Sequence, residues 1–223
     1  MTIVVGVPVY YNIPECKNSV EKLVDYSKKN MPEHEIEVCY AASDNKKWDL
    51  HDIIYKRNFI IRFAIEHNAD YILYIDDDVI VPPDGLAMML PYAQRKGLGI
   101  CAGYARVRAS DIWGAGVQFA KDSQGRVHEE PLQGNPKVIH RYVFRDPDKE
   151  PDAVAMYFTL VEKSVFRSLK FSYSENISTD AEGNKFQDGE DIEYCLKALR
   201  LSAKIGECRE VRCEHLAFNE EHK

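Results

Sequence analysis

Apolar runs alternate with helix-like segments throughout the N-terminal half, and this alternation restricts the possible folds more than any other feature. Four runs have the length and the β-branched content of buried strands: Thr2–Val9, Glu35–Ala42, Tyr71–Ile75 and Gly99–Tyr104. Helical periodicity fills the gaps between them: Glu15–Lys29, Leu50–His67 and Asp84–Arg95. A strand–helix alternation of this kind predicts an α/β fold with a doubly wound, mostly parallel sheet.

The C-terminal half is less regular. Between Arg106 and Asp152, strand-like pieces at Gly116–Ala120 and Val138–Phe144 lie among glycine, proline and charged residues. We interpret this stretch as a small antiparallel portion or a loop beside the site. The rest is predicted as a strand, a helix, a polar loop, a helix and a strand-rich end: Ala153–Val161, Lys163–Leu169, Phe171–Gln187, Gly189–Leu201 and Lys204–His215.

The charge of the chain excludes one class of partner. The formal net charge is -7, and an acidic surface repels the phosphate backbone of nucleic acids. A small phosphorylated ligand is still compatible, because a metal ion and a few cationic side chains can meet its charge locally. No apolar run approaches the length of a membrane span, and Met1 leads directly into a β-branched run. We therefore expect a cytoplasmic protein, which can still act at the surface of a membrane.

Six cysteines are scattered along the chain. Cys208, Cys213 and His215 cluster near its end, but a fourth zinc ligand at suitable spacing is missing from the sequence. We therefore expect reduced thiols, most of them buried as small apolar side chains.

Polar residues follow three of the predicted strands at the point where each strand ends. They are Tyr10, Tyr11 and Asn12; Ser43 and Asp44; and Asp76, Asp77 and Asp78. Because ligands bind beyond the carboxyl ends of the strands in open α/β sheets, these residues are predicted to share one crevice. No glycine-rich loop follows the first strand, which argues against a P-loop or a classical dinucleotide site.

The run of Asp76, Asp77 and Asp78 is the strongest chemical signal in the sequence. Adjacent carboxylates repel one another unless a cation or solvent relieves them. In a continuing strand, Asp76 and Asp78 point to the same side and can share a metal, while Asp77 points away. Such oxygen ligands suit Mg²⁺ or Mn²⁺. The alternative is an acidic turn that caps the next helix.

Five short segments occur in an informative order along the chain. They are Val7–Asn12, Arg57-Asn58, Tyr71–Asp84 with its Asp-x-Asp pattern, Met156–Phe166, and Gly189–Leu196 with its Glu-Asp pair. Together they resemble the motifs of GT-A fold glycosyltransferases, especially the large family 2 type. The resemblance implies a GT-A, Rossmann-like fold with a small antiparallel acceptor-side portion. It also implies a single domain, 1–223, in which residues 1–105 bind a nucleotide-sugar and residues 106–223 bind the acceptor.

For the donor, the resemblance implies binding at the strand ends and at the Asp-x-Asp pattern. The residues expected to bind the nucleotide-sugar are Pro8, Val9, Tyr10, Asn12, Asp44, Arg57, Asp76 and Asp77. A metal, Mn²⁺ or Mg²⁺, is expected on Asp76, Asp78 and His215, where it would neutralise charge on the leaving nucleoside diphosphate. From the residues alone, Asp44 fits a turn equally well, Arg57 fits a solvated helix position, and His215 fits a structural histidine.

For catalysis, the resemblance implies that Asp191 deprotonates the acceptor hydroxyl, with Glu190 and Asp188 as competitors. Asp191 falls in the first turn of a predicted helix, where the helix dipole favours the carboxylate form. The same residue types also serve as helix caps, which is the structural alternative. On the acceptor side, Trp113, in the segment Asp111-Ile-Trp-Gly-Ala-Gly, either stacks on a sugar face or belongs to the core.

The predicted function is metal-dependent transfer of a hexose from a UDP- or GDP-sugar to an acceptor hydroxyl, and the family 2 resemblance favours inversion. A glycan, a lipid-linked molecule or a protein can each serve as acceptor. One alternative is a palm-type nucleotidyltransferase, suggested by Tyr74-Ile-Asp-Asp, and another is a sugar nucleotidyltransferase. The acidic charge argues against the first, and the lack of a glycine-rich loop argues against the second. A catalytically inactive nucleotide-sugar-binding protein is the remaining alternative.

Overall fold

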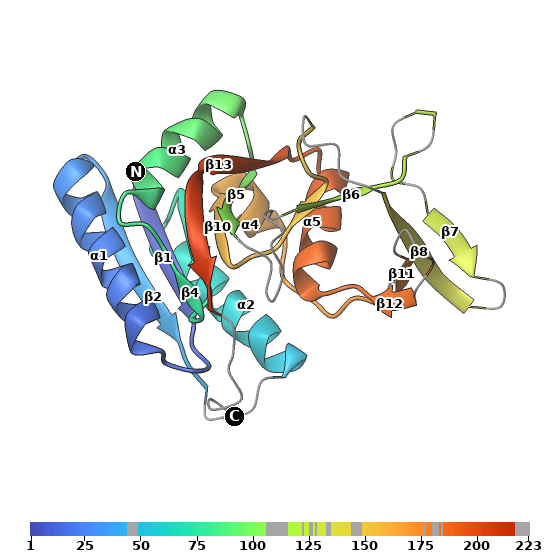
Figure 1. Cartoon of the computed structure of the whole chain (residues 1–223), viewed down its shortest axis with the longest axis horizontal. Helices are drawn as coiled ribbons and strands as arrows, with labels where there is room; N and C mark the ends of the chain where they lie inside the picture. Colours follow the sequence, from blue (N-terminus) through green and yellow to red (C-terminus); the bar gives the residue numbers. More distant parts are fainter. Residues whose placement is uncertain are drawn as a thin grey trace.

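A computed structural model describes most of the chain, shown in Figure 1. The described residues are 1–43, 49–105, 116–121, 123–124, 127, 129–132, 135–143, 149–175, 177–179, 183 and 185–216. Of the predicted residues, Asp44 and Trp113 lie outside these ranges.

Within the described residues, seven strands form the main sheet, in the order β2-β1-β3-β10-β5-β13-β4. Their bounds are Glu35–Ala41 for β2, Thr2–Pro8 for β1, Tyr71–Ile75 for β3, Phe158–Glu162 for β10, Ile100–Ala105 for β5, Ile205–His215 for β13 and Val79–Ile80 for β4. Strands β2, β1, β3, β5 and β13 run parallel, while β10 lies antiparallel between β3 and β5, and β4 lies antiparallel to β13. The predicted mostly parallel sheet is therefore confirmed, and strands from both halves of the chain build it.

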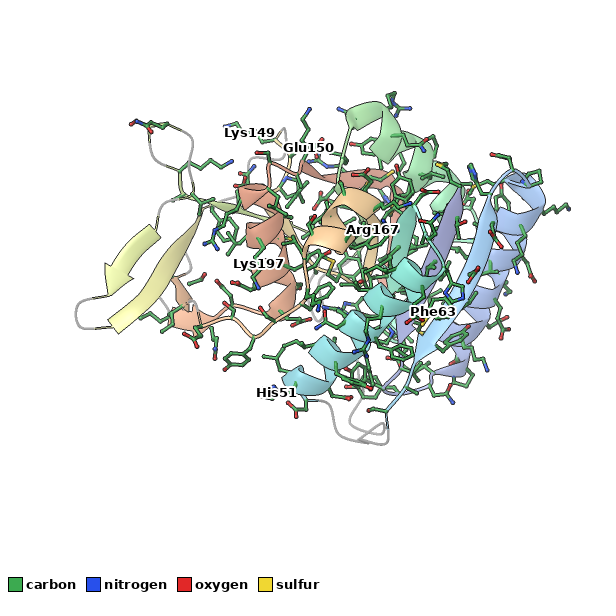
Figure 2. All side chains as sticks on the ribbon, turned by 180° about the vertical axis from the view of Figure 1, so that it is seen from behind. His51, Phe63, Lys149, Glu150, Arg167 and Lys197 are labelled. Carbon is green, nitrogen blue, oxygen red and sulfur yellow. The ribbon has the colours of Figure 1, made fainter. Side chains whose placement is uncertain are left out.

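Four helices of the described chain pack on this sheet in two pairs, α1 with α3 and α2 with α4. Their bounds are Pro14–Asn30 for α1, Leu50–Glu66 for α2, Gly85–Lys96 for α3 and Lys163–Ser168 for α4. Because crossovers between parallel strands are right-handed and β1 lies between β2 and β3, α1 and α2 cover opposite faces. In Figure 2, Phe63 on α2 and Arg167 on α4 mark the face that both helices cover.

A second, smaller sheet has the strand order β12-β11-β8-β6-β9, with β7 paired to β8. Its bounds are Lys185–Gln187 for β12, Ile177–Thr179 for β11, Asn135–Val143 for β8, Gly116–Phe119 for β6, Ala153–Val154 for β9 and Glu129–Leu132 for β7. Helix α5, Glu190–Arg200, lies between the two sheets (Figure 1). The antiparallel pairing of β6 with β8 and of β7 with β8 confirms the predicted antiparallel portion.

Two predictions for the C-terminal half were wrong. The expected strand Ala153–Val161 is divided into β9 and β10 by a turn, in which the Tyr157 carbonyl accepts a hydrogen bond from the Asp76 N–H. The expected loop Phe171–Gln187 contains the short strands β11 and β12, which pair with each other and with β8. In both cases pairing with distant residues decides the local structure.

An aromatic cluster joins α5 to the main sheet. The Phe171 ring stacks on Tyr194 of α5 at a centroid distance of 4.1 Å and meets Tyr74 of β3 edge-on at 5.6 Å. The side-chain amide of Asn58 donates to the Phe171 carbonyl and accepts from its N–H, both at 2.9 Å. These contacts fix the start of α5 beside α2 and β3, which is where the site lies.

Two further sequence predictions can be compared with the structure. All six cysteines are free and buried, as expected. No helix of the described part of the chain combines the length and the apolar character that crossing a membrane requires.

The contact between Gly6 of β1 and Ile60 of α2 gives a test of the packing. A Cβ atom on Gly6 would lie 2.4 Å from Ile60 Cγ2, well inside van der Waals contact. We expect Gly6→Ala to destabilise the protein by about 1–3 kcal/mol through overpacking. Urea denaturation of Gly6→Ala, Ile60→Ala and the double variant checks this. The double variant should lose less free energy of unfolding than the sum of the two single variants; strict additivity would contradict the contact.

Candidate active site

A pocket of about 540 Å³ opens where β1, β3 and α5 meet. Its walls are the loop after β1, the three aspartates after β3 (hereafter the Asp turn), α2, the 155–157 turn, the start of α5 and the end of β13. The lining residues are Tyr10, Tyr11, Ile53, Arg57, Asp76, Asp77, Asp78, Ala155, Met156, Tyr157, Glu190, Asp191 and His215. The structure thus brings together eight of the predicted site residues from both halves of the chain, namely Tyr10, Arg57, Asp76, Asp77, Asp78, Glu190, Asp191 and His215. The pocket lies at the carboxyl edge of the parallel strands, as predicted.

The three aspartates form a turn between β3 and β4, not a continuation of the strand. The turn is closed by a hydrogen bond from the Val79 N–H to the Asp76 carbonyl at 3.2 Å. The expectation that strand geometry sets the directions of these side chains was therefore wrong. Each carboxylate instead has its own surroundings.

Asp77 organises the loop that follows β1. Its Oδ2 accepts the backbone N–H groups of Tyr10 at 2.6 Å, Tyr11 at 2.6 Å and Asn12 at 3.0 Å. Asn12 adopts a positive φ of 51°, a conformation that asparagine tolerates better than most residues. Successive N–H groups that converge in this way make an anion-binding nest, and the carboxylate of Asp77 occupies it. The middle aspartate therefore fixes the shape of the loop that follows β1.

Arg57 bridges two carboxylates that are far apart in the sequence. Its Nη2 lies 3.1 Å from Asp76 Oδ1, and its Nη1 donates to Glu190 Oε1. Arg57 is only 2% exposed. Burial alone would lower the pKa of Arg57, but the charges of Asp76 and Glu190 outweigh it and raise the pKa. Burial also raises the pKa of Asp76, and the guanidinium opposes that shift.

Asp78 and His215 lie side by side at the far end of the pocket. His215 Nε2 is 3.4 Å from Asp78 Oδ1, and the imidazole stacks on the Tyr157 ring at 5.8 Å. The Tyr157 hydroxyl in turn bridges the Ala105 N–H and the Gly103 carbonyl, each at 3.1 Å. Asp76, Asp78 and His215 line the same pocket, although in the described residues no three His, Cys, Asp or Glu side chains are gathered into a metal-binding cluster.

Asp191 stands in the first turn of α5, on the wall of the pocket. Its Oδ1 accepts the Ile192 N–H at 2.8 Å. Burial raises the pKa of Asp191 to about 7; the neighbouring Glu190 carboxylate adds to the shift, while Arg57 opposes it. A carboxylate that titrates near neutral pH is suited to take up a proton.

The remaining predicted residues lie around this pocket. Pro8 is buried at the end of β1, and Asp188 is buried just before α5, 2% exposed. Val9 and Asn12 line a neighbouring, largely apolar cavity of about 340 Å³, which also has Asp77 in its wall.

Three residues of the site were missed from the sequence. Lys56 is fully buried beside Tyr10, Asn58 holds Phe171, and Tyr157 supports His215. A lysine or an asparagine on a helix is normally exposed, and both have partners that the sequence alone does not reveal. The signal that could have identified Lys56 is its place on the α2 face that carries Ile53 and Ile60.

No family model matches the chain, and no curated protein matches it. Several solved structures match the chain. A197 from STIV superposes with a TM-score of 0.54 at 12% identity, over 98% of this chain and 87% of that one. S. aureus TarS 1–349 in complex with UDP superposes with a TM-score of 0.50 at 15% identity, over 100% of this chain and 62% of that one. The same TarS fragment in complex with UDP-GlcNAc gives 0.50 at 12% identity, over 98% and 60%.

These likenesses show that the chain has a GT-A-like, Rossmann-like fold, as predicted. The chain spans about three fifths of the TarS fragment that it matches.

The raised pKa of Asp191 predicts a dependence of stability on pH. The folded chain holds this proton up to about pH 7, whereas an unfolded aspartate loses it near pH ~4. Between these values the folded state binds more protons, so the contribution of Asp191 to the free energy of unfolding falls as pH rises. Asp191→Asn cannot ionise and should therefore gain stability relative to wild type between pH 5 and pH 8. Urea denaturation at both pH values measures this, and an unchanged difference would contradict the raised pKa.

Proposed function

We propose that this chain is a glycosyltransferase that binds a nucleoside-diphosphate-sugar in the 540 Å³ pocket and transfers the sugar to an acceptor hydroxyl. One observation carries the proposal. The buried Arg57 joins the Asp turn to the Glu-Asp start of α5, so donor-side and acceptor-side groups face a single pocket. The GT-A-like fold and the UDP and UDP-GlcNAc complexes of TarS support a nucleotide-sugar as the donor.

The donor side of the proposed site is the loop after β1 together with the Asp turn. Tyr10 and Tyr11 present aromatic rings to the pocket, and their backbone is held by Asp77. Pro8, Val9 and Asn12 complete the loop, and Asp44 is proposed to contact the base. A nucleoside lying on this loop would direct its diphosphate toward Asp76 and Asp78.

The proposed metal is Mn²⁺ or Mg²⁺. Asp78 and His215 offer an oxygen and a nitrogen ligand side by side, and Asp76 adds a carboxylate in the same pocket, a donor set that fits Mn²⁺. Asp78 and His215 would hold the ion, and Asp76 would add a third ligand by moving toward them. When bound, such an ion supplies electrostatic stabilisation to the leaving nucleoside diphosphate.

Asp191 is the proposed general base. Its carboxylate faces the pocket, and its pKa near 7 makes it a stronger base than an ordinary aspartate. It would remove the proton from the acceptor hydroxyl as that oxygen attacks the sugar from the side opposite the diphosphate, which inverts the configuration. Glu190 is already engaged by Arg57, so we assign it to positioning.

The alternatives fit the site less well. A palm-type polymerase needs a basic channel, whereas carboxylates dominate this pocket. A catalytically inactive binding protein has no need for a buried aspartate with a raised pKa beside the donor site.

The donor and the metal are tested by titration calorimetry with UDP, GDP and their sugars, with and without Mn²⁺. We expect Mn²⁺ to tighten binding to wild type, and Asp78→Ala to lose that gain because it removes a ligand next to His215. At about 100 times its Kd, the nucleotide should add about 2.7 kcal/mol to the stability of wild type.

Asp84→Ala is the matched control, because Asp84 follows the same turn but does not line the pocket. It should bind as wild type does. Absence of binding by every nucleotide in the presence of Mn²⁺ would exclude the proposed function.

A further inference from the structure

Lys56 is a buried lysine at the donor side, with 0% of its surface exposed. A buried ammonium is unfavourable unless charged or polar groups surround it. Its Nζ has three such neighbours: Asp52 Oδ2 at 2.6 Å, the Val9 carbonyl at 2.7 Å and the face of the Tyr10 ring, whose centroid is 3.4 Å away. Lys56 therefore links α2 to the loop after β1.

The helix fixes the position of the ammonium. Asp52 and Lys56 are four residues apart on α2, so they lie on the same helix face and their ion pair is held by the helix itself. The ammonium then binds the carbonyl of Val9, directly before Tyr10. Because aromatic faces carry partial negative charge, the ammonium of Lys56 attracts the Tyr10 ring and keeps the face of the ring turned toward it.

Besides Lys56, the Tyr10 ring contacts the Tyr11 ring, with the centroids 6.2 Å apart and the planes tilted by 50°. Asp77 holds the backbone N–H of Tyr10 but not its side chain. The Tyr10 hydroxyl is buried and has no hydrogen-bond partner among the described residues. The contact between the ring face and Lys56 is thus the specific polar restraint on the ring, and the ring lines the 540 Å³ pocket.

We propose that Lys56 is a positioning residue that holds the Tyr10 ring as a platform for the base of the nucleotide. The inference rests on the proposed function, because it assumes that a nucleotide enters this pocket. Lys56 acts through Tyr10 on the base, and the diphosphate is bound elsewhere, at the Asp turn. Loss of Lys56 should therefore weaken binding of a nucleotide and leave binding of a bare diphosphate unchanged.

The test compares the Kd of UDP with that of inorganic pyrophosphate by calorimetry in the presence of Mn²⁺. The main variant is Lys56→Met combined with Asp52→Asn, so that no buried carboxylate is left without its partner. We expect its Kd for UDP to rise about tenfold, as for loss of a desolvated cation–π contact, and its Kd for pyrophosphate to stay within about twofold of wild type. In a Tyr10→Leu background the same substitutions should change neither Kd.

Two further variants sharpen the result. Lys56→Gln keeps a hydrogen-bond donor for the Val9 carbonyl but removes the positive charge. It changes the packing less than the double variant does, and it should show the same selective rise in the Kd for UDP. Arg62→Met is the matched control, because Arg62 lies over the exposed Tyr55 and Phe59 rings of the same helix, outside the pocket. It should bind both ligands as wild type does.

Equal weakening of UDP and pyrophosphate would overturn the inference, since a general loss of structure affects both ligands. A tenfold effect that persists in the Tyr10→Leu background would also overturn it, because Lys56 would then act without Tyr10. Failure of the proposed function gives a different result: wild type itself would bind no nucleotide, and the inference would fall with it.

Discussion

The buried guanidinium of Arg57 is the interaction on which the rest of the structure depends. It joins the Asp76 carboxylate, after β3, to the Glu190 carboxylate, at the start of α5. Arg57 and Glu190 are 133 residues apart in the sequence. It also lies over the Phe171 ring, at 5.4 Å from its centroid. Removing one partner of a buried pair costs about 3–5 kcal/mol, because the other charge is left unpaired. Arg57 therefore holds the two halves of the site together, alongside the contacts of Phe171 with Asn58, Tyr74 and Tyr194.

Around Arg57, each acidic side chain of the pocket is compensated in a different way. The Asp77 carboxylate accepts hydrogen bonds from backbone N–H groups, and Asp78 faces His215. Asp76 and Glu190 share the guanidinium of Arg57. Within the described part of the chain, Asp191 forms no ion pair at contact distance, and burial raises its pKa to about 7. The site thus separates carboxylates that hold structure or ligands from one that can accept a proton.

Most of the fold could be predicted from the sequence. The β1, α1, β2, α2, β3 and α3 elements follow from apolar periodicity, which is a local property, and the predicted bounds differ from the observed ones by one residue or so. The division between β9 and β10 and the strand β4 could not be predicted, because Tyr157 and Val79 obtain their partners from distant parts of the chain.

The candidate site was predictable in its residue types but not in its contacts. Three consecutive aspartates are equivalent in the sequence and all line the pocket, yet the turn gives Asp77 a structural role, which is to bind the loop after β1. Lys56 and Asn58 were missed because their partners, Tyr10 and Phe171, lie 46 and 113 positions away. The ligand roles of Asp44 and Trp113 stay predictions.

The measurement that tests the central claim most directly is release of the nucleoside diphosphate from a panel of UDP- and GDP-sugars with Mn²⁺, with water or an added sugar as acceptor. Wild type should release the diphosphate from at least one donor, and Asp191→Asn should do so about 10²–10⁴-fold more slowly, as expected for loss of a general base. Its Kd for that donor should change little. No release from any donor that binds, or equal release by Asp191→Asn, would contradict the account.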